Sequence, residues 1–141
     1  HHEISRAKRL VVRQRIDEAL EALRYALRGL PSSELRLLSG TTVKQAHIPP
    51  PVVRDPDAFL VSKEDAVREA ACLLWAIGAS DHARQLLNYQ LKRGDVRSVL
   101  QLAWIELAEG NLEAAKRTHD AFVTVAPQLA SEALPLEHHL K

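Results

Sequence analysis

The sequence has few of the residues that disulfide-rich, β-rich or membrane-spanning proteins need. There is a single cysteine, Cys72, so no disulfide can form within the chain. Aromatic residues make up only 4% of the chain, although hydrophobic residues make up 46%. This balance suits close-packed helices better than a β-sandwich or a barrel. The apolar run from Ala70 to Ile77 is too short to cross a membrane as a helix. The composition therefore predicts an all-α protein.

Charge and motif content argue against several functions. The formal net charge is only +1, which gives no global electrostatic reason to bind nucleic acid. The glycines are scattered and form no phosphate-binding loop. The histidines do not have the spacing of metal ligands, and no Ser-His-acid or Cys-His motif occurs. We therefore predict no enzymatic activity, catalytic residue, metal, cofactor or small-molecule substrate.

The start of the chain carries no secretory signal pattern, and this predicts a cytoplasmic protein. The first two residues, His1 and His2, resemble the remnant of a tag. Whether the chain is a fragment of a larger protein therefore stays open.

The stretch from Ser98 to Pro127 has the clearest helical pattern. Residues 99–109 are apolar almost all round, which predicts a helix covered on both sides. Gly110 can take the left-handed conformation that ends a helix, and Asn111 is a good N-cap for the next one. Pro127 closes the second helix because proline cannot continue a helix interior. The stretch is predicted to be two helices joined by a tight turn.

This pattern recurs along the chain. Ala71 and Gly78 precede Ala103 and Gly110 by 32 residues, and Ala7 precedes Ala71 by 64 residues. Small residues at fixed places let helices approach closely, so that one helix pair can stack on the next. We therefore predict one domain over residues 1–141, with helix pairs at about 1–31, 63–94 and 96–127.

Two segments, Arg15–Pro31 and Leu102–Ala115, resemble the tetratricopeptide repeat family, whose period is about 34 residues. The resemblance implies a right-handed superhelix of helix-turn-helix repeats. It is degenerate, because Leu10, Leu74 and Glu106 stand where the family usually has an aromatic residue. It concerns the fold and does not by itself identify a function.

Residues 32–62 are predicted to be irregular, because three consecutive prolines, Pro49 to Pro51, cannot be helical. The segment has about the length of one repeat, and it can be read as a decayed repeat, an insertion or a linker. Residues 128–141 are predicted to contain a cap helix that is broken at Pro135 and followed by a frayed tail.

Side-chain caps are predicted at several helix starts. Ser62 and Asp65 have the spacing of a capping box. Ser80 or Asp81 is expected to cap the following helix, and Asp95 the helix after it.

The resemblance also implies a binding surface, because the first helices of tetratricopeptide repeats line a concave groove that holds a partner segment. The Lys/Asn set that clamps acidic tails in part of that family is absent, since Cys72 and Trp104 replace the asparagines. An apolar groove with tryptophans is typical of sites for an amphipathic helical or extended segment of another protein. The alternative is that both tryptophans are core residues. The predicted groove residues are Arg68, Cys72, Trp75, Leu100, Gln101, Trp104 and Leu107.

A second surface is predicted on the first helix, where Arg6, Arg9 and Arg13 fall on one stripe. Such a stripe can contact phosphates or an acidic partner, or it can be a solvated helix face. The main hypothesis is a non-enzymatic adaptor, scaffold or chaperone-like module that binds another protein. The alternatives are a nucleic-acid-associated regulatory domain that uses the arginine stripe, and a self-associating domain, for example a homodimer.

Overall fold

The computed structural model describes residues 2–30 and 62–140. In these two ranges the chain forms helices and no strand, so the prediction of an all-α protein is confirmed. Apart from Ser62, the predicted irregular segment lies outside the described residues. In chain order the elements are α1 (His2–Val12), α2 (Ile16–Ala26), α3 (Lys63–Ala76), α4 (Ser80–Lys92), α5 (Arg97–Ala108), α6 (Leu112–Val125), the 3₁₀ helix η2 (Pro127–Ala133) and α7 (Leu134–Leu140).

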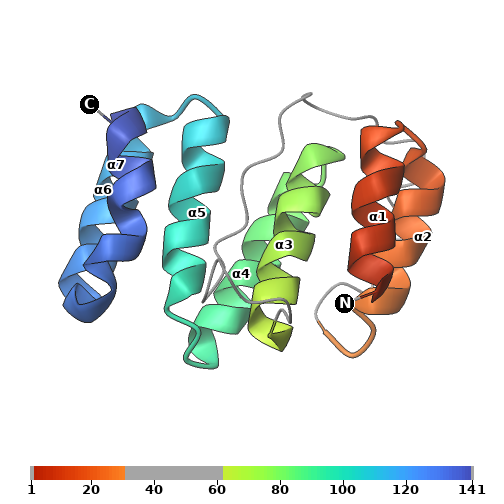
Figure 1. The fold of residues 1–141 in the computed structure, drawn as a ribbon, viewed down its shortest axis with the longest axis horizontal. Helices are drawn as coiled ribbons and strands as arrows, with labels where there is room; N and C mark the ends of the chain where they lie inside the picture. Colours follow the sequence, from red (N-terminus) through yellow and green to blue (C-terminus); the bar gives the residue numbers. More distant parts are fainter. Residues whose placement is uncertain (1, 31–61, 141) are drawn as a thin grey trace.

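Consecutive helices pack as pairs, α1 with α2, α3 with α4 and α5 with α6. The pairs also contact one another, because α3 packs on α1 and α5 packs on both α3 and α4. Figure 1 shows α1, α3, α5 and α7 next to one another along the long axis, with α4 behind α3 and α6 behind α7. The described chain is therefore a row of helical hairpins that is closed at one end by η2 and α7.

Local sequence signals explain several of the helix ends. Ser62 and Asp65 form the expected capping box, with each side chain accepting from the other residue's backbone N–H. Asn111 caps α6 by accepting a hydrogen bond from the Ala114 N–H at 3.2 Å. The turn before it uses Gly110 with a φ of +81°. In the first pair, Gln14 adopts a positive φ of 60° at the equivalent turn.

Two of the predicted caps are wrong. Neither Ser80 nor Asp81 caps α4, which begins after Ala79 without a side-chain cap. Likewise, no side chain caps α5, whose N-cap position is Val96. Ser80 instead donates to Glu109 at 2.9 Å, and Asp95 accepts from Arg68. Contacts between helix pairs therefore replace the expected local caps.

The C-terminal prediction needs a correction as well. Pro135 does not break a helix, because it lies in the first turn of α7, where a missing backbone N–H costs nothing. The residues after it are not a frayed tail within the described range. Leu136 and Leu140 are buried in the hydrophobic core.

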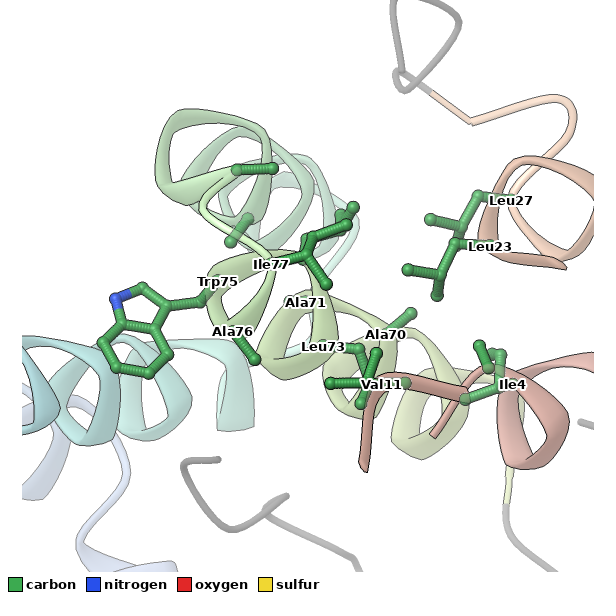
Figure 2. Close-up of a cluster of buried hydrophobic side chains, with 14 of the residues drawn as sticks. Ile4, Val11, Leu23, Leu27, Ala70, Ala71, Leu73, Trp75, Ala76 and Ile77 are labelled. Atoms are coloured by element: carbon green, nitrogen blue, oxygen red, sulfur yellow. The ribbon is translucent and has the colours of Figure 1, made fainter. Parts of the chain in front are cut away.

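The core consists of two hydrophobic clusters with α5 between them. The first joins buried residues of α1 to α4 with Ile105, and the second joins α5, α6, η2 and α7. Figure 2 shows part of the first cluster, with Ile4, Val11 and Leu23 on one side of α3 and Trp75 extending on the other. Because α5 contributes to both clusters, few of its positions are free to carry polar side chains.

Candidate functional site

The three predicted groove residues on α3 are all buried. Arg68 is 1% exposed, and Cys72 and Trp75 are completely buried. Arg68 forms ion pairs with Asp65 and Asp95. Trp75 belongs to the first hydrophobic cluster, so the reading of this tryptophan as a core residue agrees with the structure. In this conformation none of the three presents its side chain to a partner.

The four predicted groove residues on α5 divide into two kinds. Leu100 and Gln101 are completely buried. Trp104 and Leu107 are half-buried and pack against the second cluster. The Trp104 ring meets the His139 ring of α7 edge to face, with 5.7 Å between the ring centroids. Of the seven predicted groove residues, these two are half-buried and the other five are buried.

The partly exposed positions of α5 are mainly apolar. Its polar residues that reach solvent are Arg97 and Glu106. Neighbouring partly exposed apolar side chains, such as Trp104 and Leu107 one turn apart on α5, mark interaction sites more often than scattered single residues do. We call the half-buried apolar residues of α5 the apolar α5 surface. Val99, Trp104 and Leu107 of this set pack against the second cluster, and Leu102 and Ala108 pack against the first.

The three arginines of the predicted stripe are exposed, but only Arg6 and Arg9 lie in α1, because the helix ends at Val12 and Arg13 is in the turn that follows. Arg6 lies 3.6 Å from Glu3, whereas Arg9 and Arg13 form no ion pair within the described part of the chain. Their neighbour Lys8 pairs with Glu69 of α3 at 3.4 Å, which ties the first helix pair to the second.

Two polar networks join the second and third helix pairs, and sequence reasoning missed both. In the first, Arg68 links Asp65 of its own helix to Asp95, which also accepts from the Ser98 hydroxyl at 3.0 Å. The side chains of Arg68, Asp65 and Asp95 are 1%, 6% and 9% exposed. The three-residue spacing of Asp65 and Arg68 is a local signal that could have indicated one of these ion pairs, whereas Asp95 lies in another helix pair and gives no such signal.

The second network surrounds Glu109 at the end of α5. Its carboxylate accepts from Arg84 and from the Ser80 hydroxyl. Burial by itself would raise the pKa of Glu109, but these hydrogen bonds outweigh it and hold the pKa below its ordinary value. The indole N–H of Trp75 makes no hydrogen bond of good geometry, yet it also favours the charged carboxylate. The network therefore holds α5 against α4 with an ionised glutamate.

A pocket of about 660 Å³ lies where α2 and α4 end and where α3 and α5 begin. Its described lining includes residues at the ends of all four of these helices, so no local sequence pattern predicts the pocket. Glycines with positive φ, Gly29 and Gly94, border it. Basic side chains in the lining outnumber acidic ones by five to two: Arg28, Lys63, Arg68, Arg93 and Arg97 against Glu64 and Asp95.

No metal-binding arrangement occurs in residues 2–30 and 62–140, where no group of three or more His, Cys, Asp or Glu side chains could hold an ion. The Cys72 thiol is fully buried, and burial raises its pKa, so the reactive thiolate is disfavoured. No described helix is long and apolar enough to cross a membrane.

Comparison with known proteins identifies no relative. No family model, no curated protein and no solved structure matches this chain significantly.

Proposed function

We propose that this chain is a degenerate tetratricopeptide-like array, a right-handed superhelix that serves as a non-enzymatic protein–protein interaction module. The observation that carries the proposal is the apolar α5 surface. A helix that lies between two core clusters and still leaves a tryptophan and a leucine partly exposed has apolar area available to a partner.

The chemistry of this surface favours a particular class of partner. Trp104 offers a large, rigid ring, and tryptophan is enriched among the residues that dominate binding energy. Leu107 adds aliphatic area one helical turn further along α5. Apolar side chains at this spacing suit an amphipathic helix or an extended segment with regularly placed apolar residues. The partner is therefore a protein segment, which the module would hold as an adaptor, scaffold or chaperone-like protein.

The proposal assigns different roles to the two tryptophans. Trp75 is completely buried, so its replacement should act on stability and reach binding only through the fold. Trp104 is half-buried, so its replacement should act on binding with a smaller effect on stability. This difference separates a binding role from a purely structural one.

The test begins with peptides selected from a displayed library of amphipathic segments on the full chain. Their affinity is then measured for the wild type and for Trp104→Ala and Leu107→Lys. We expect each substitution to weaken binding by about tenfold or more, since residues at the centre of an interface contribute about 2 kcal/mol or more. Circular dichroism should show unchanged helicity.

Leu91→Lys is the matched control, because Leu91 is an exposed leucine on α4, outside the apolar α5 surface. It should leave peptide affinity unchanged. Equal losses in the control and the α5 variants would contradict the proposal. Light scattering measures the mass in parallel. A wild-type dimer that Leu107→Lys converts to a monomer would identify a second copy of the chain as the occupant of this surface.

A further inference from the structure

The pocket at the ends of α2 and α4 is separate from the apolar α5 surface. None of the five residues of that surface belongs to its described lining. The pocket is bordered by helix ends. Basic side chains predominate in its lining, whereas the α5 surface is apolar. What it binds can therefore be argued independently of the function proposed above.

Not all the charged groups of this pocket are available to a ligand. Arg68 and Asp95 are paired with each other, and Arg97 donates to Glu132 at 2.8 and 2.7 Å. Arg28, Lys63 and Arg93 are exposed, and none of them forms an ion pair with another described residue. Glu64 likewise has no ion-pair partner among the described residues, so three basic groups and one acidic group are available and the net charge at the pocket is positive.

The two available arginines are held in the same way at the ends of different helices. The Arg28 guanidinium lies over the Tyr25 ring at 4.2 Å and donates to the Tyr25 carbonyl at 3.1 Å. The Arg93 guanidinium lies 5.5 Å from the centre of the Tyr89 ring and donates to the Tyr89 hydroxyl at 3.2 Å. Stacking fixes the plane of a guanidinium while most of its N–H donors stay free. Each arginine can thus receive a carboxylate with little further loss of side-chain entropy.

The backbone next to each arginine leaves room for a ligand. Gly29 follows Arg28 and Gly94 follows Arg93, with φ angles of +86° and +94°. Apart from the adjacent residues in the chain, no atom of the described residues lies within 4 Å of the position where a side chain would begin at either glycine. A peptide chain can therefore approach both turns closely.

The geometry favours an acidic peptide segment over a single small oxyanion. The start of α3 is one place where an oxyanion could bind, but the Ser62–Asp65 capping box already occupies the backbone N–H groups of Ser62 and Asp65. Glu64 adds a repelling charge at the same place. The free cations come from three different elements around a volume that could hold several side chains. Carboxylates spaced along a chain match this distribution better than one compact anion does.

We propose that this pocket binds an acidic peptide segment, whose carboxylates pair with Arg28, Arg93 and Lys63. Glu64 tunes the site by repelling carboxylates from the start of α3. The pocket would recognise the charge of the peptide's carboxylates and their spacing along the chain. It would give the module a second binding site, chemically different from the apolar α5 surface.

The test uses nitrogen–proton NMR correlation spectra of the full chain, in which glycine amides are well separated because the chain has only five glycines. The probe is a short peptide of alternating glutamate and alanine with blocked ends. We expect it to shift the signals of Gly29 and Gly94 in a saturable way. The signals of Gly78 and Gly110, which do not line the pocket, should stay in place. The glutamine–alanine peptide should shift none of them.

Substitutions make the test specific to the pocket. Arg28→Gln with Arg93→Gln should weaken binding of the acidic peptide by about tenfold or more, because two charge-assisted contacts are lost. Glu64→Gln should strengthen it by about twofold or more, which a structural role would not explain. Arg9→Gln with Arg13→Gln is the matched control, since these exposed arginines, in α1 and in the turn after it, do not belong to the described lining of the pocket.

Several outcomes would overturn the proposal. The glutamine peptide could produce the same shifts, or the α1 control could lose as much affinity as the pocket variant. Inorganic phosphate could shift the same glycines and displace the peptide, which would make the pocket a small-oxyanion site. Trp104→Ala should leave this binding unchanged, so failure here and failure of the function proposed for the apolar α5 surface can be told apart.

Discussion

Replacing Arg68 by methionine should destabilise the protein more than any exposed charge substitution. The side chain is 1% exposed and holds two carboxylates, Asp65 and Asp95, that are 6% and 9% exposed. The substitution leaves these two charges buried without their cation. Breaking a buried ion pair in this way costs about 3–5 kcal/mol. That is a large part of the roughly 5–15 kcal/mol that stabilises a domain of this kind. The melting temperature should fall by roughly 10 °C or more.

The measurement is urea unfolding followed by circular dichroism, with thermal unfolding in parallel. Arg15→Met is the matched control, because Arg15 and Glu18 form an ion pair in which both side chains are about half exposed. It should cost less than about 1 kcal/mol. The neutral triple variant, Arg68→Met with Asp65→Asn and Asp95→Asn, should recover much of the loss, since no unpaired charge stays buried.

The reasoning would be refuted by an Arg68→Met protein within about 1 kcal/mol of the wild type, because so small a loss is typical of exposed pairs. It would also be refuted if the triple variant were less stable than the single variant. That result would mean that the three side chains contribute through hydrogen-bond geometry and packing, with charge pairing of little weight.

Two further predictions concern groups whose pKa is shifted. The pKa of Glu109 is held below its ordinary value of 4.5, so the stability that this carboxylate contributes is present above pH 4.5 and is lost as the pH falls through its lowered pKa. The wild type should therefore lose more free energy of unfolding on acidification than Glu109→Gln does, and parallel curves would contradict the lowered pKa. Burial raises the pKa of the Cys72 thiol, so a thiol reagent at about pH 8 should label the unfolded chain and leave the folded one unlabelled. Rapid labelling of the native protein would show that Cys72 is accessible.

Features that depend on a few neighbouring residues could be predicted from the sequence. The Ser62–Asp65 capping box and the Gly110–Asn111 turn are present as expected, because each is formed by groups within four residues of one another. The all-α class follows from composition and from the helical spacing of apolar residues. Hydrogen bonds within a helix and between a cap and the first turn are local, so local sequence is sufficient to specify them.

The candidate sites could be predicted only in part. The resemblance to tetratricopeptide repeats predicted Cys72 and Trp75 on a groove-lining face, but it could not show whether that face is covered. Both prove to be fully buried, while Trp104 keeps part of its surface. The basic pocket had no sequence signal, because Arg28 and Arg93 are far apart in the chain and meet only when two helix ends come together.

The sequence by itself therefore determined the helices, most of their ends and the pairing of neighbours through tight turns. The tertiary structure decided which polar residues cap helices and which join them. Ser80 and Asp95 were good local caps, yet Glu109 and Arg68 bind them across helix pairs. For Asp95 the physical reason is that the buried charge of Arg68 must be paired, and this requirement outweighs the roughly 1 kcal/mol that a cap contributes. Ser80 instead adds a hydrogen bond to the half-buried Glu109, which Arg84 already pairs.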